Sequence, residues 1–148
     1  MKRAFTTNLL SAVLLCVSLA SCGDKEDAKP KEHDVEVRFQ ATAIPSNYTG
    51  QWYVEENDGS GATTTFATNP NSTESRIHKA SRAKVKGNEI EAMVRLSPVT
   101  STATLSVSTS IKADVVVDGV VKQTIMVDRN TPADQSGDRE RSVLLKLE

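Results

Sequence analysis

The most constraining feature of this sequence is the alternation of apolar and polar residues that begins at Val35. Val35, Val37 and Phe39 are separated by single polar residues, and the pattern continues to Ala43. A period of two puts the apolar side chains on one face of a β-strand, whereas an α-helix needs a period near 3.6. Residues 35–43 are therefore predicted to form a strand with one buried face, ended by Pro45.

The same period recurs along the rest of the chain. Residues 101–117 alternate for so long that a single strand would reach about 55 Å, and we expect a break near Ser108–Ser110. Further strands are predicted over 51–56, 62–67 and 142–147, the first two joined by a turn-rich loop and the last with Val143, Leu145 and Leu147 facing inward.

One hairpin is predicted around Gly87-Asn88, because a two-residue turn there would match the side chains on both faces. Lysines would then lie opposite glutamates on one face, and apolar residues would lie opposite each other on the other face. The predicted pairs are Lys86 with Glu89, Lys84 with Glu91, Val85 with Ile90, and Ala83 with Ala92.

A second hairpin is predicted around Asp118-Gly119. A two-residue turn would mix polar and apolar residues on each face, whereas a three-residue loop with a left-handed glycine in a bulge keeps them apart. We therefore predict a loop of Val117, Asp118 and Gly119, because a one-residue slip would move the apolar set to the wrong face. Its pairs are Val116 with Val120, Val115 with Val121, Ile111 with Ile125, and Asp114 with Lys122.

Seven to nine short strands with frequent turns predict one all-β domain over residues 35–148, an antiparallel Ig-like β-sandwich. Trp52 shares a strand face with Val54, which favours a place in the core. Tyr53 points the other way, so Tyr53 and the nearby Tyr48 are the candidate ligand contacts.

The N-terminus is typical of a secretory signal peptide over residues 1–21. Lys2 and Arg3 precede an uncharged run, Leu9–Ala20, which is too short to span a bilayer as a helix. Leu19-Ala20-Ser21-Cys22 then resembles the lipobox of bacterial lipoproteins. That resemblance implies cleavage between Ser21 and Cys22 and a lipid on the Cys22 thiol, which would anchor the chain to a membrane.

Residues 22–34 lack large apolar side chains and are predicted to be a flexible tether. Its acidic cluster, Asp24-Lys25-Glu26-Asp27, resembles the export signal of Bacteroidetes-type lipoproteins. That resemblance implies transport to the outer face of the outer membrane, whereas a tether charged only for solubility would leave the domain on the periplasmic face. Both locations stay open.

Catalytic chemistry is not indicated anywhere in the chain. Without residues 1–21, which hold two of the 18 basic residues, 16 basic and 19 acidic side chains leave a net charge of −3 and no basic stripe for nucleic acid. His33 and His78 have no ligand motif near them, so no metal or cofactor is expected. We expect no catalytic residues and no enzyme. The polar loop 128–140 is either functional or, as its composition favours, disordered.

The segments KVKGNEIEAMV and IKADVVVDGVVKQT resemble the small Ig-like lipoproteins of Bacteroidetes, and weakly the MmpS-like transport accessory proteins. The resemblance implies a non-enzymatic accessory or binding domain that supports a membrane transporter or another envelope protein. A structural subunit that offers edge strands to a surface assembly and a surface glycan-binding module are the alternatives.

Overall fold

The computed structural model describes residues 31–58, 62–67 and 73–148, and in these ranges every regular element is a β-strand. The strands are antiparallel and form two four-stranded sheets, which confirms the predicted all-β sandwich. One sheet has the order β4-β1-β6-β7, with β1 at Val35–Thr42, β4 at Glu74–Lys79, β6 at Ser110–Val117 and β7 at Val120–Asp128. The other has the order β3-β2-β5-β8, with β2 at Tyr48–Asn57, β3 at Ala62–Ala67, β5 at Glu89–Pro98 and β8 at Arg139–Lys146.

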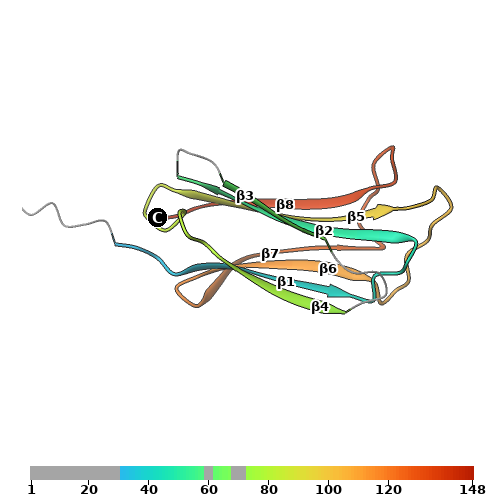
Figure 1. Ribbon diagram of the computed structural model, residues 1–148, viewed down its shortest axis with the longest axis horizontal. Helices are drawn as coiled ribbons and strands as arrows, with labels where there is room; N and C mark the ends of the chain where they lie inside the picture. Colours follow the sequence, from blue (N-terminus) through green and yellow to red (C-terminus); the bar gives the residue numbers. More distant parts are fainter. Residues whose placement is uncertain (1–30, 59–61, 68–72) are drawn as a thin grey trace, which may run out of the picture.

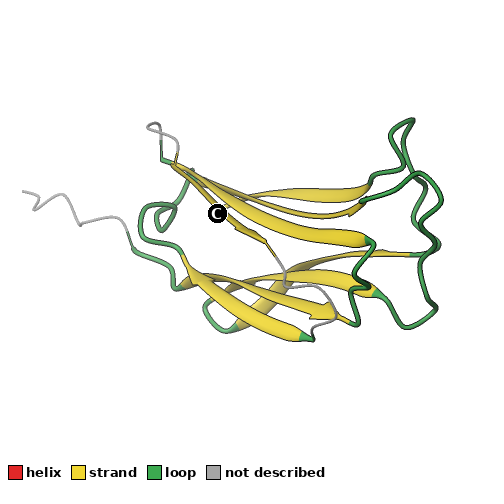
Figure 2. Ribbon diagram, turned by 45° about the vertical axis from the view of Figure 1, so that its right-hand side comes forward, coloured by secondary structure: helices red, strands yellow, loops and turns green. Residues whose placement is uncertain are grey.

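The two sheets lie face to face, and their connections gather at the two ends of the sandwich (Figures 1 and 2). We call the end where residue 31 joins the domain the entry end, and the opposite end the far end. The entry end holds the β4–β5 connection and the turn at 118–119. The far end holds the loops 43–47, 99–109 and 129–138.

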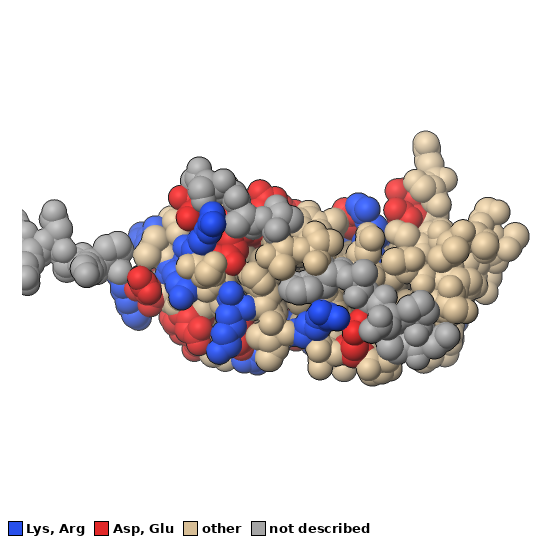
Figure 3. All heavy atoms as spheres, in the orientation of Figure 1, with Lys and Arg blue, Asp and Glu red and all other residues tan. Residues whose placement is uncertain are grey.

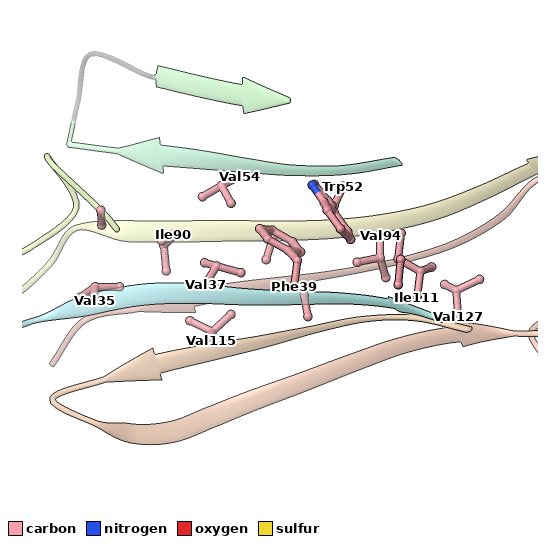
Figure 4. Close-up of a cluster of buried hydrophobic side chains, with 14 of the residues drawn as sticks. Val35, Val37, Phe39, Trp52, Val54, Ile90, Val94, Ile111, Val115 and Val127 are labelled. Carbon is pink, nitrogen blue, oxygen red and sulfur yellow. The ribbon is translucent and has the colours of Figure 1, made fainter. Parts of the chain in front are cut away.

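The core fills the space between the sheets (Figure 4). Trp52 is 1% exposed and stacks on Phe39, with ring centroids 5.1 Å apart. The side chains of β1 and β2 alternate between buried and more exposed positions, as a period of two requires. The predicted core position of Trp52 is therefore confirmed.

The hairpin predicted at Gly87-Asn88 is wrong. Only Glu89 and the residues after it enter the sheet, where β5 pairs with β2 on one side and β8 on the other. Glu89 lies opposite Lys146 and Asn57, not opposite Lys86. Gly87, with φ of +93°, is instead the third residue of a turn closed by the Asn88 N–H, which donates to the Val85 carbonyl at 3.0 Å.

The second predicted hairpin is in the right place, but its three-residue loop and its register are wrong, because Val117 pairs with Val120 and leaves a two-residue loop. Asp118 and Gly119 have φ of 51° and 77°, the pair of positive values that a two-residue type I′ turn requires. The bulge lies in β7, where Val116 pairs with Val121 but Val115 pairs with Gln123, so that Lys122 is the extra residue. Consequently Ile111 pairs with Val127 and Asp114 with Thr124, in place of the predicted Ile125 and Lys122.

The remaining strand predictions agree with the structure at their centres. The hairpin of β2 and β3 and the inward positions of Val143, Leu145 and Leu147 are confirmed. β6 begins at Ser110, as the predicted break requires, but residues 101–109 are a loop and not a strand. The last residues of the predicted tether contact the domain, since Glu32 bridges to Val85.

Candidate functional site

A carboxylate lies buried at the entry end of the sandwich. Glu56, near the end of β2, is 3% exposed and follows Trp52 and Val54 on the inner face of its strand. Its Oε2 atom accepts hydrogen bonds from the backbone N–H groups of Ser81, Arg82 and Ala83 at 2.9, 2.6 and 3.1 Å. Glu56 therefore ties the β4–β5 connection to the opposite sheet.

The other oxygen of Glu56 binds a histidine. Nε2 of His78, on β4, lies 2.7 Å from Oε1 of Glu56. Burial acts to raise the pKa of Glu56, but the hydrogen bonds from Arg82, His78, Ala83 and Ser81 outweigh it, so the pKa lies below its usual value. Glu56 is thus an ionised cross-link between the sheets, with one oxygen bonded to His78 and the other to three backbone N–H groups.

A second titratable pair joins the start of the described chain to the β6–β7 turn. His33 Nδ1 lies 2.9 Å from Oδ2 of Asp118, and the Asp34 N–H donates to Oδ1 of Asp118 at 3.0 Å. These hydrogen bonds lower the pKa of Asp118. The pair borders a hollow of about 400 Å³, whose other lining residues include Val117, Val120, Lys122, Leu145 and Leu147.

The loop 99–109 at the far end is fixed to its neighbours at three points. The Val99 N–H donates to the Asn47 carbonyl at 2.8 Å, and the Thr109 hydroxyl donates to the Ala43 carbonyl at 3.0 Å. The third point is the hydroxyl of Tyr48, which donates to the Ala103 carbonyl at 3.2 Å. Ala103 and Leu105 pack against the core, so the loop is a preformed surface.

The same loop presents apolar side chains to solvent. Val107 is 73% exposed and Val99 is 62% exposed, the largest fractions among the large apolar side chains that the structure describes. No charged residue occurs between positions 97 and 111. In Figure 3 charged side chains crowd toward the entry end, whereas most of the visible far end carries none. The loop 99–109 is therefore an uncharged part of the far end with two protruding valines, next to the loop 129–138, which carries Arg129, Asp134 and Asp138.

The two tyrosines predicted from the sequence as candidate ligand contacts, Tyr48 and Tyr53, lie in different environments. Tyr48 is 4% exposed, and its hydroxyl holds the loop 99–109, so its ring offers no surface to a ligand. Tyr53 is half-buried on the outer face of β2, with its hydroxyl 3.5 Å from Oε1 of Glu91. Burial and the nearby carboxylates of Glu91, Glu140 and Glu55 raise the pKa of Tyr53.

The polar loop after β7 has a defined conformation, contrary to the disorder that its composition favoured. Oδ1 of Asp128 accepts from the Asn130 N–H at 2.8 Å, and Oδ1 of Asp134 accepts from the Ser136 N–H at 2.8 Å. Such side-chain turns are local and short-ranged. Gly137 closes the loop against the neighbouring β5 strand, since a Cβ built there would lie 3.0 Å from Pro98.

The residues on which the anchoring predictions depend, Ser21, Cys22 and the acidic cluster 24–27, lie outside the described residues. Within the described ranges no three His, Cys, Asp or Glu side chains are grouped as a metal site would need. Those ranges also hold no helix with the length and apolarity to cross a membrane.

Sequence reasoning missed both Glu56 and the far-end valines. The sequence does carry a signal for Glu56, because Glu56 follows Trp52 and Val54 at a spacing of two and so lies on the same buried face of the strand. The signal for the valines is weaker. It is the long uncharged run 97–111, whose alternation of apolar and polar residues predicts a strand in place of a loop. Comparison of the chain with protein families, curated proteins and solved structures finds no match.

Proposed function

We propose that this protein is a lipid-anchored envelope lipoprotein whose β-sandwich is a non-enzymatic accessory or binding module. In this proposal Cys22 carries the lipid and holds the entry end near the outer membrane, on its surface or its periplasmic face. The domain, of the Ig-like kind that the sequence suggests, acts by contact with another envelope protein, such as a membrane transporter.

The observation that carries this proposal is the position of the exposed valines. Val99 and Val107 lie at the far end, opposite the end through which the chain would reach its anchor. Apolar side chains that protrude from an uncharged loop favour association with another protein. Because the loop is already fixed by hydrogen bonds, binding would lose little conformational entropy.

The experiment is site-specific photo-cross-linking in cells that produce the full chain. A photoreactive residue at Val107 should form an adduct with an envelope protein, and Val99→Ser should weaken that adduct several-fold. The matched control is Val121, which is 50% exposed on β7 toward the entry end. Equal adducts from both positions, or none from Val107, would contradict far-end contact.

A structural subunit is the second candidate, and the free edge of β8 favours it. β8 pairs only with β5 within the described sheet and exposes Leu144. Strands at an edge carry unpaired backbone groups that can bind another strand. The size of the assembly in mild detergent separates the two candidates, because a contact module leaves it small and an assembly subunit does not.

A further inference from the structure

We propose that two copies of this chain pair through strand β8, antiparallel, with the two-fold axis at Val143. The inference rests on the edge-strand candidate named above and is independent of contact through the far end. Its partner is a second copy because the outward-facing charges of β8, Glu140 and Lys146, are complementary across the axis, while Arg139 and Arg141 lie opposite apolar residues.

The β8 edge is regular. Its ladder with β5 runs from Glu89 opposite Lys146 to Leu96 opposite Arg139 without a register shift. β7, the other edge strand on this side of the sandwich, is interrupted by the bulge at Lys122. Bulges hinder edge pairing, and an uninterrupted edge permits it. β8 is therefore the better template.

The outward-facing side chains of β8 carry opposite charges at its two ends. Glu140 and Lys146 are each three residues from Val143 and lie on the outer face with Ser142 and Leu144. An antiparallel partner centred on Val143 places Glu140 opposite Lys146 of the partner copy, twice over. Parallel pairing at the same register would instead put like charges opposite each other, which is unfavourable.

These pairs extend ion pairs that exist within each chain. Arg95 Nε donates to Glu140 Oε2 at 2.6 Å, and Lys146 Nζ lies 3.7 Å from Glu89 Oε1. Across the two-fold axis the charges then alternate along one row: Arg95, Glu140, Lys146 of the partner copy, and Glu89 of the partner copy. Each charge in the row therefore has neighbours of opposite sign, which favours the dimer at both ends of the paired strands.

The same register covers an exposed leucine. Leu144 is 60% exposed; it would lie opposite Ser142 and diagonal to Leu144 of the partner copy, within reach of a long side chain. Arg141 belongs to the inner face but is exposed, so its guanidinium can remain in water after pairing. In this register inner-face residues lie opposite inner-face residues, so both cores lie on the same side of an eight-stranded sheet.

The test is disulfide cross-linking of the full chain in intact cells. Directly opposed antiparallel residues have Cα atoms about 4.5–5.5 Å apart, within the range of a disulfide. Val143→Cys should therefore form an oxidised dimer of the chain. Val121→Cys, on the bulged edge strand, and the unmodified chain with its own Cys16 and Cys22 are the matched controls and should not form it.

Charge exchange then tests the register. In the Val143→Cys chain, Glu140→Lys should weaken the dimer roughly ten-fold or more, because two attractive pairs become repulsive. Adding Lys146→Glu should restore most of the dimer, since the charges across the two-fold axis match again, although the pairs with Arg95 and Glu89 within each chain are lost. Melting temperatures of the variants check that the fold survives.

Two results would overturn the inference. One is a Val143→Cys chain that gives no more dimer than Val121→Cys, and the other is a dimer that Glu140→Lys leaves unchanged. A photoreactive residue at Leu144 that joins a different protein would also refute a second copy, while supporting edge pairing as such. Far-end contact is measured separately at Val107, so each idea can fail alone.

Discussion

Replacement of Glu56 should destabilise the protein more than replacement of any exposed carboxylate. Its carboxylate accepts three backbone N–H groups and bonds to His78, all within 2.6–3.1 Å. A hydrogen bond to a charged acceptor contributes about 1.5–3 kcal/mol. The amides of Ser81 and Arg82 belong to exposed residues and can find water, which leaves two bonds, to Ala83 and His78, without a substitute.

Glu56→Ala should therefore lower the free energy of unfolding by about 3–5 kcal/mol, the cost typical of breaking a buried pair. Urea denaturation of the full chain at pH 7 measures it. Glu140→Ala is the matched control, because the Glu140 side chain is 39% exposed and ion-paired with Arg95 on the outer face, and it should cost below ~1 kcal/mol. A loss under ~1 kcal/mol for Glu56→Ala would refute the cross-link.

The acid dependence of stability should follow from the same carboxylate. The pKa of Glu56 is lower in the folded chain than in the unfolded chain, so the folded state holds its charge more strongly. The stabilisation is complete above the unfolded pKa, about 4.3, and is lost as the pH falls through the lower folded pKa. Glu56→Gln should flatten the fall of unfolding free energy in acid, and an unchanged acid slope would count against the assignment.

Three other outcomes are expected. Trp52→Ala, which removes the ring stacked on Phe39, should cost about 3–5 kcal/mol in urea denaturation. Gly137→Ala should cost about 1–3 kcal/mol in the same assay, because φ is +87° and the added Cβ would press on Pro98. A stabilised protein would mean that the lower entropy of the unfolded chain outweighs this strain. Cys22→Ser should move the protein out of the membrane fraction, and persistence there would contradict the lipid anchor. Protease treatment of intact cells should then show whether the anchored domain faces outward.

The sandwich could be predicted because burial on one face of a strand leaves a direct mark on the sequence. Val37, Phe39 and Trp52 are all buried where the period of two places them. Within loops the same period misleads, as residues 101–109 show. Ala103 and Leu105 pack on the core and Val107 points to solvent, although no neighbouring strand is present to pair with them.

The candidate site was harder to predict because its parts come from distant positions. Glu56 meets His78 and Ala83 only after β2 and β4 are placed in opposite sheets. The place of Glu56 on the buried face of its strand marks it as unusual, but no neighbouring residue in the sequence identifies the groups that it binds. The exposed valines indicate a contact surface only because they lie opposite the entry end, and that position is set by the fold.

The failed hairpin shows why strand register exceeds what local matching can decide. Lys84 and Lys86 match Glu91 and Glu89 in charge, yet Glu89 finds an equally matched partner in Lys146, far along the chain. A cross-strand pair contributes only about 0.2–1 kcal/mol, so several registers compete on charge alone. Burial decides between them. β5 alternates half-buried and buried residues from Glu89 to Ser97, and it is a central strand, paired with β2 on one edge and β8 on the other, whose inner face packs against the opposite sheet. The self-matching charges of β8 are subject to the same ambiguity, which is why exchange of Glu140 and Lys146, and not their pattern, must decide the pairing of two copies.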